Sequence, residues 1–142
     1  MERTETRIFR TPFGWAGVAA TGKGIAQIVP PRKTKRQVEK EIPAAVRGLC
    51  CAETGHAATE KLLKKAIALL TRHLSGKIAS FDLPLDLRYY TAFQQAVWRA
   101  AASIPRGETR SYAWIATRIK RPKAVRAVGN ALGANPVPIL IP

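Results

Sequence analysis

The sequence predicts an α/β (α+β) chain of two units, and three features of its apolar pattern lead to this prediction. Short apolar segments separated by turn residues fill the first 30 positions, as in an antiparallel sheet. Apolar residues at helical spacing then recur between residues 57 and 133. An extended stretch that contains proline interrupts the helices, so we expect domains at 1–80 and 88–142 joined by a connector at 81–87.

Within the first domain, the pattern predicts strands at 7–9, 15–20 and 25–29, separated by turns at 11–14 and 21–24. We expect Pro30 and Pro31 to end the last strand. Residues 32–41 carry dense mixed charge. A DNA-contacting patch is one interpretation of this segment, and a solvated loop or helix face is the one we prefer.

Helical spacing predicts one long and three shorter helices. The long one, over 57–74, has an apolar stripe that includes Leu63 and Leu70, and Ser75-Gly76 is a suitable stop. Thr91 and Gln94 match a capping box that opens the next helix. Ser111 can cap a short helix over 112–119, and a third runs from Pro122 to Gly133. The last two, joined by a tight turn, form a helix-turn-helix pattern.

The last predicted helix is unusual because most of its side chains are small. Val125, Val128 and Leu132 are spaced to face the core. Two helical glycines cost about 1 kcal/mol each relative to alanine, so close approach to another surface should offset that cost. That surface is either a DNA groove, with Arg126 as the one long side chain, or a neighbouring protein segment. Spacing alone leaves both interpretations open.

Composition limits the classes of function open to the chain. The 142 residues include 24 Lys and Arg against 9 Asp and Glu, a formal charge of +15, and both halves are basic. This balance favours a partner with a phosphate backbone, a protein that is merely basic being the alternative. A hydrophobic share of 46% excludes a disordered polycation, and no apolar run approaches the ~20 residues of a membrane-spanning helix. We expect a monomer that does not bind membranes.

The two cysteines, Cys50 and Cys51, are adjacent, so a disulfide between them would be strained. Even with His56 nearby they lack the paired spacing of a metal site, and we expect neither a metal nor another cofactor. The N-terminus has no apolar core of signal-peptide length. These features favour a reducing, cytoplasmic location, or the nucleus in a eukaryote.

The C-terminal stretch is extended and apolar. Prolines at 136, 138 and 142 forbid a helix, and residues 139–141 require burial. Because a chain terminus is usually polar and exposed, we expect the natural chain to continue beyond Pro142, so that this sequence is truncated.

The last 62 residues resemble the alkylguanine-DNA alkyltransferases, also called methylated-DNA–protein-cysteine methyltransferases. The resemblance lies in five segments that follow in the family's order and spacing: FDLPLDL at 81–87, FQQAVW at 93–98, IPRGETRSY at 104–112, RPKAVRAVGNA at 121–131 and NPVPILIP at 135–142. It implies a small ribonuclease H-like first domain and a winged-helix-like second domain. Trp114 departs from the pattern, since a polar residue, often glutamate, is common there; we interpret it as scaffold variation.

The resemblance implies DNA repair by direct, stoichiometric transfer of an alkyl group from O6-alkylguanine in double-stranded DNA to a cysteine. That cysteine would directly follow Pro142, so the chain as written is expected to be inactive. Tyr112 would help to rotate the nucleotide out of the duplex and assist the leaving group, and Asn135 would orient the active-site loop. Pro138 would line the substrate pocket. The implied DNA-binding residues are Arg126, which fills the space of the extruded nucleotide, with Tyr112, Lys123, Ala124 and Gly129.

Two other functions remain as alternatives. Alkyltransferase-like proteins keep the helix-turn-helix and the arginine but place another residue at the cysteine position, and they bind lesions without repairing them. A basic regulator that reads the major groove is the other alternative. The small side chains of residues 124–134 argue against it, because they offer few long groups to base edges.

Overall fold

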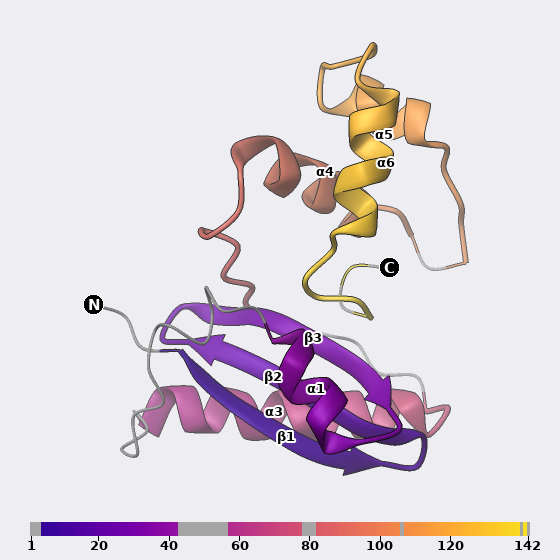
Figure 1. Cartoon of the computed structure of the whole chain (residues 1–142). Helices are drawn as coiled ribbons and strands as arrows, with labels where there is room; N and C mark the ends of the chain where they lie inside the picture. The colour runs from indigo at the N-terminus through magenta and orange to yellow at the C-terminus, as the bar shows by residue number, and fades with distance from the viewer. Residues whose placement is uncertain (1–3, 43–56, 78–81, 106, 140, 142) are drawn as a thin grey trace. The chain divides into compact units, whose positions relative to one another are not determined.

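The computed structural model describes residues 4–42, 57–77, 82–105, 107–139 and 141. These residues form three strands and five helices, which confirms the predicted mixed class (Figure 1). The chain divides after Asp86 into two compact units, Met1–Asp86 and Leu87–Pro142. Cys50, Cys51 and His56 lie outside the described residues. No helix in the described part of the chain is long and apolar enough to cross a membrane.

The first unit is built on an antiparallel sheet whose strands follow the chain order: β1 (Glu5–Thr11), β2 (Gly14–Thr21) and β3 (Gly24–Arg32). Both predicted turns are present, and each ends at a glycine with positive φ, 127° at Gly14 and 159° at Gly24. The Thr11 hydroxyl donates to the Gly14 carbonyl at 2.9 Å and closes the first turn.

The prediction that Pro30 and Pro31 end the third strand is wrong, because β3 continues to Arg32, which pairs with Trp15. Two features make the prolines acceptable. β3 lies at the edge of the described sheet, where one side of the strand needs no N–H donor. The pairing register also shifts between Trp15 and Gly17, so the prolines fall at an irregularity of the ladder.

Two helices cover opposite faces of the sheet (Figure 1). α1 (Lys35–Glu41) begins with a capping box at Thr34 and buries Val38 in a cluster with Ala19 and Val29. Most of its other side chains are exposed, which agrees with the solvated helix face preferred from the sequence. α3 (Ala57–Leu74) has the predicted bounds and covers the other face.

Neighbouring side chains of β1 show this division, since successive residues of a strand point to opposite faces. Ile8 packs against the α1 cluster, whereas Arg7 donates to Glu60 of α3 at 2.6 Å. The buried positions of α3 include Leu63 and Leu70 of the predicted stripe. The helix ends as expected, with Gly76 at a φ of 81°.

The stretch that follows α3 returns to the sheet of the same unit. Leu85 forms a parallel bridge with Ile25, whose amide donates to the Pro84 carbonyl at 2.7 Å. The Asp86 amide donates to the Ile25 carbonyl at 2.8 Å, and the Thr21 hydroxyl donates to the Asp86 carboxylate at 2.5 Å. Residues 84–86 are therefore bonded into the first unit.

The second unit contains α4 (Ala92–Ala102), α5 (Tyr112–Arg118) and α6 (Val125–Gly133). The capping box at Thr91 is present as predicted, and the Ser111 hydroxyl accepts from the Trp114 amide at 3.1 Å. Trp98 of α4 is fully buried and donates from Nε1 to the Ala131 carbonyl at 2.8 Å, which ties α4 to α6.

The last predicted helix, expected from Pro122, begins three residues later, at Val125. Residues 121–124 form a turn instead, in which the Ala124 amide donates to the Arg121 carbonyl at 2.9 Å. The Arg121 amide in turn donates to the Ala116 carbonyl at 2.8 Å, and Lys120 has a φ of 63°. This turn is bonded to the end of α5, and Pro122 lies within it.

Candidate nucleic-acid interface

Almost all charged residues of the second unit are basic. Residues 87–142 hold nine Lys and Arg and one acidic residue, Glu108, which leaves a formal charge of +8 on 56 residues. Residues 1–86 hold fifteen against eight, or +7. The positive charge is thus denser on the unit that carries α5, the turn and α6. Such a field attracts polyanions.

α6 has a buried side and an exposed side. Val128 is fully buried and Ala131 nearly so, while Arg126 and Asn130 are exposed. In the described residues Arg126 has no hydrogen-bond or ion-pair partner. Since residues three and four apart share a helix face, Arg126, Gly129, Asn130 and Gly133 lie along one side of α6. That side presents one long cationic side chain among small groups.

The expectation that Val125 faces the core is wrong, because it is 37% exposed. It is the first residue of α6, one turn before the buried Val128, where the helix leaves the turn at 121–124. Leu132, the third member of the predicted stripe, is half-buried.

Tyr112 packs against the small side of α6. It opens α5 and is 52% exposed, which leaves much of its ring in solvent. A Cβ placed on Gly129 would lie 3.1 Å from Tyr112 Cε2 and 3.3 Å from Cδ2. Gly129 is therefore small because an aromatic ring lies against it, whereas a Cβ on Gly133 would meet no atom within 4 Å. The small side serves protein packing at Gly129 and is open at Gly133.

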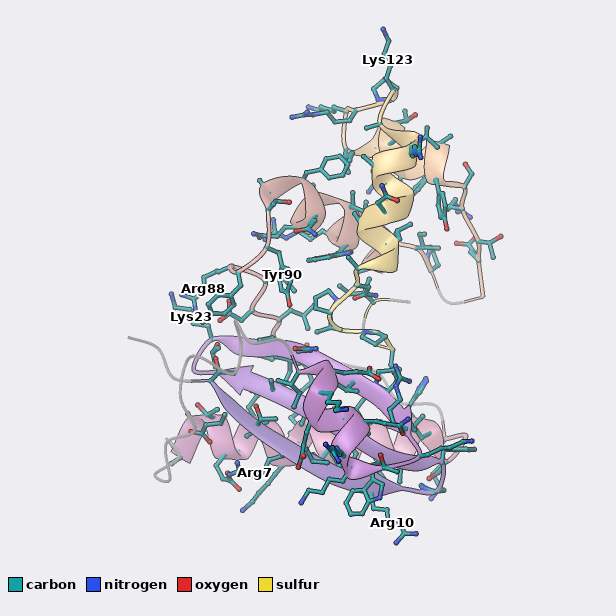
Figure 2. The ribbon with its side chains drawn as sticks, viewed as in Figure 1. Arg7, Arg10, Lys23, Arg88, Tyr90 and Lys123 are labelled. Carbon is teal, nitrogen blue, oxygen red and sulfur yellow. The ribbon has the colours of Figure 1, made fainter. Side chains whose placement is uncertain are left out.

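Lys123 and Ala124 occupy the turn before α6. The Lys123 side chain points away from the ribbon into solvent (Figure 2). Ala124 is the N-cap of α6, is half-buried and makes no side-chain cap. Lys123 and Arg126 thus place two exposed cations at the start of α6.

Asn135 organises the loop that follows α6. Its Nδ2 donates to the Ile141 carbonyl at 2.9 Å, and its Oδ1 accepts from the Val137 amide at 2.9 Å. The Ile141 amide donates to the Val137 carbonyl at 3.1 Å, and both side chains are buried. One side chain thus holds the backbone at both ends of the loop. Pro138 is half-buried and forms a bridge with Ile141, while Pro142 lies outside the described residues.

A second group of cationic side chains, to which the sequence pattern gave no role, lies just before α5 and at its end. The guanidinium carbons of Arg110 and Arg118 lie 5.6 Å and 5.5 Å from the centroid of the Trp114 ring. The spacing of four residues between Trp114 and Arg118 could have indicated this contact, because such pairs meet on a helix. Among the described residues, no group of three or more His, Cys, Asp or Glu could hold a metal ion.

A basic helix-turn-helix with one arginine on an otherwise small face belongs to the class of DNA-binding units. The family model for the 6-O-methylguanine DNA methyltransferase DNA-binding domain matches residues 92–142. A methylated-DNA–protein-cysteine methyltransferase of Methanosarcina barkeri is 38% identical over 135 residues, which cover 95% of this chain and 77% of that protein. This chain belongs to the methylated-DNA–protein-cysteine methyltransferase family.

Other relatives agree over shorter or similar lengths. The Mycobacterium tuberculosis protein of that name is 51% identical over 77 residues, or 54% of this chain and 46% of the relative. The chain therefore aligns with about half the length of that relative. The crystal structure of M. tuberculosis O6-methylguanine methyltransferase matches with a TM-score of 0.72 at 34% identity, covering 98% of this chain and 75% of the other. A second structure of that enzyme, in complex with DNA, has a TM-score of 0.64 at 34% identity, with 96% and 74% covered.

Proposed function

We propose that this chain is part of a DNA-repair protein that removes alkyl groups from O6-alkylguanine by transferring them to a cysteine, once per molecule. Its partner is double-stranded DNA that contains the lesion. The observation that carries the proposal is the exposed side of α6, which presents Arg126 to solvent and, three residues further on, packs Gly129 against the half-exposed ring of Tyr112. Family membership supports the same assignment.

The proposed roles follow from the chemistry of the substrate. The alkylated oxygen of guanine lies within the base stack, so the nucleotide must leave the duplex before it can react. Arg126 is the only long side chain on its side of α6, and we assign it the space that the extruded nucleotide leaves. The Tyr112 hydroxyl would hydrogen-bond the extruded guanine, and Lys123, Ala124 and Gly129 would line the DNA surface.

The transfer itself is a direct displacement. A thiolate sulfur attacks the alkyl carbon, an S–C bond forms, and the bond from that carbon to O6 breaks. The electron pair of that bond passes to the guanine, which takes up a proton, and the Tyr112 hydroxyl would assist this departure. We place the acceptor cysteine directly after Pro142, as in the family's signature. Asn135 holds the loop that leads there, and Pro138 would form part of the pocket wall.

The proposal includes neither a metal nor another cofactor, since the thiolate supplies the nucleophile. A monomeric state is part of the proposal, and so is a cytoplasmic location, because a free thiolate requires reducing surroundings. Cys50 and Cys51 lie in no matching motif, so the 142-residue chain by itself is expected to leave O6-methylguanine in DNA intact.

Base extrusion is tested with the 142-residue chain and a duplex that carries O6-methylguanine beside 2-aminopurine, whose fluorescence rises when its stacking is lost. The chain is expected to raise this fluorescence, and Arg126→Ala is expected to abolish the rise. Lys120→Ala, which removes an exposed cation outside α6, serves as the control and should retain most of the rise. Equal losses in both variants would contradict the assigned role of Arg126.

Alkyl transfer is tested on the product of the complete coding sequence, and by reading the coding DNA beyond codon 142. A cysteine codon next, with a gain of one benzyl mass after incubation with O6-benzylguanine, is the expected result. A tryptophan codon with no adduct would instead indicate a lesion-binding protein that does not transfer the group. A stop codon would contradict the proposed position of the nucleophile.

A further inference from the structure

The outer side of α5 carries a cluster that the proposed reaction does not use. Arg110 precedes the helix, Trp114 lies in its middle and Arg118 is its last residue. Both guanidinium groups lie over the same indole ring, at 5.6 Å and 5.5 Å from its centroid. We call these three residues the guanidinium clamp.

The clamp holds two positive charges on one indole ring with little to neutralise them. Arg110 has one acidic neighbour, Glu108, at 3.4 Å, and it also donates to the Thr109 carbonyl at 2.9 Å. In the described residues Arg118 has no carboxylate partner. Guanidinium groups with so little neutralisation attract an anion to the surface beside them.

The indole fixes these cations without using their hydrogen-bonding groups. A guanidinium stacks on a ring through its face, so the ring does not use its N–H donors. Arg110 donates to Glu108 and to the Thr109 carbonyl, whereas in the described residues the donors of Arg118 are available to a phosphate. Both arginines are exposed, and a free Arg side chain loses conformational entropy of roughly 2 kcal/mol when it is fixed. Contact with Trp114 reduces that loss before an anion binds.

The position of the clamp indicates which anion it binds. Arg110 lies two residues before Tyr112, and Arg118 lies two residues before Lys120 in the turn. The clamp therefore lies in the same basic unit as the proposed DNA-binding residues Tyr112 and Arg126. DNA bound by this unit is the polyanion that its positive field favours. Guanidinium pairs suit phosphate oxygens, and they read no sequence.

We propose that the guanidinium clamp binds the phosphate backbone of DNA, with Trp114 as a positioning residue that holds Arg110 and Arg118 ready for the phosphates. This inference rests on the proposed DNA-binding function. It gives a role to a tryptophan that departs from the pattern of the family, in which a glutamate at this position would remove the ring and add a negative charge.

Salt dependence of binding to an undamaged duplex tests the charges. Each phosphate neutralised contributes about 0.9 to the slope of log affinity against log salt, so Arg110→Ala combined with Arg118→Ala should reduce the slope by about 1.8. Arg99→Ala is the matched control, because Arg99 is an exposed arginine of α4 that hydrogen-bonds to Gln95 of its own helix. The control should leave the slope nearly unchanged.

Two substitutions of Trp114 test the positioning role, since neither changes the charge. Trp114→Leu removes the aromatic face and is expected to weaken binding by about threefold to tenfold at fixed salt, from the loss of two cation–π contacts. Trp114→Phe keeps an aromatic face and should retain most of the affinity. Circular dichroism and thermal unfolding would show that each variant is folded.

The outcomes separate the two proposals. If the unchanged chain fails to bind duplex DNA at low salt, the proposed function fails and the clamp with it. If the chain binds but the double arginine variant keeps its slope, or Arg99→Ala lowers the slope equally, the clamp is overturned while DNA binding stands. Equal affinities for Trp114→Leu and Trp114→Phe would overturn the positioning role. A double variant that binds DNA normally but loses affinity for an acidic peptide would indicate a protein partner instead and also overturn the clamp.

Discussion

Gly129 is the position where a missing side chain decides the placement of a functional one. A methyl group there would crowd the Tyr112 ring at 3.1 Å, whereas a methyl at Gly133 would meet nothing within 4 Å. Both substitutions to alanine favour the helix, by up to about 1 kcal/mol. We therefore expect Gly133→Ala to raise the free energy of unfolding with lesion binding unchanged.

Gly129→Ala is expected to show a smaller gain in stability together with weaker binding, because the half-exposed ring can yield only by leaving its position. Thermal unfolding and titration with a duplex containing O6-methylguanine measure the two quantities. Identical binding by both variants would show that the position of Tyr112 does not depend on Gly129.

Tyr90 makes the free energy of unfolding of the second unit depend on pH in the alkaline range. Burial raises the pKa of its phenol above the ordinary value, and its ring meets Trp98 edge-on at 5.0 Å between centroids. The native state keeps the proton at a pH where the unfolded chain releases it, so the free energy of unfolding falls as pH rises above about 10. Tyr90→Phe should lose less stability between about pH 9 and about pH 11 than the unchanged chain, as measured by urea unfolding. Parallel losses would contradict this assignment.

At the scale of elements, the bonds of residues 84–86 make this stretch part of the first unit rather than a free linker. Thr21 is fully buried and Asp86 nearly so, and each is the other's partner at 2.5 Å. Removing either partner deletes a buried hydrogen bond to a carboxylate, at a cost of about 1–3 kcal/mol.

A double-mutant cycle tests this contact. Thr21→Val and Asp86→Ala are each expected to lower the free energy of unfolding by about 1–3 kcal/mol, and the double variant by less than their sum. Urea unfolding of all four proteins supplies the comparison, with the exposed Thr109→Val as a control that should change little. Strict additivity would mean that the two side chains do not stabilise each other.

Elements that local chemistry determines were predictable from the sequence. The capping box at Thr91, the cap at Ser111 and the bounds of α3 agree with the structure, because hydroxyl caps and helical periodicity act within a few residues. The end of β3 was not predictable, since it depends on the partner strand and its edge position. The start of α6 likewise depends on bonds between the turn and α5.

The candidate site likewise contains some features that could be predicted from the sequence and others that could not. The residues themselves were predictable from motif spacing, but the contact between Tyr112 and Gly129 joins two helices and could not be read from one of them. The bonds of Asn135 to both ends of its loop are also tertiary. Helical spacing could have indicated the contact of Trp114 with Arg118, four residues later, but not its contact with Arg110, which precedes the helix.

At the scale of the whole molecule, charge is distributed unevenly between the two units. The second carries nine basic residues and one acidic residue over 56 positions, against fifteen and eight over 86 positions in the first. Cations of the first unit have acidic neighbours, as in the pair of Arg32 of β3 with Glu41 of α1, whose hydrogen bond and charge raise the pKa of Arg32. The first unit therefore presents a weaker net field to a polyanion.

Hydrogen–deuterium exchange of the 142-residue chain with and without a DNA duplex tests this division. We expect added protection in residues 108–133, which contain the guanidinium clamp, the turn and α6, because these carry most of the exposed cations described in the second unit. Residues 32–41 should change little, and they serve as an internal control because their net charge per residue is higher than that of 108–133. Raising the salt concentration should remove the protection of 108–133 before the chain unfolds. Protection centred on 32–41 instead would revive the DNA-contacting interpretation of that segment and transfer the interface to the first unit.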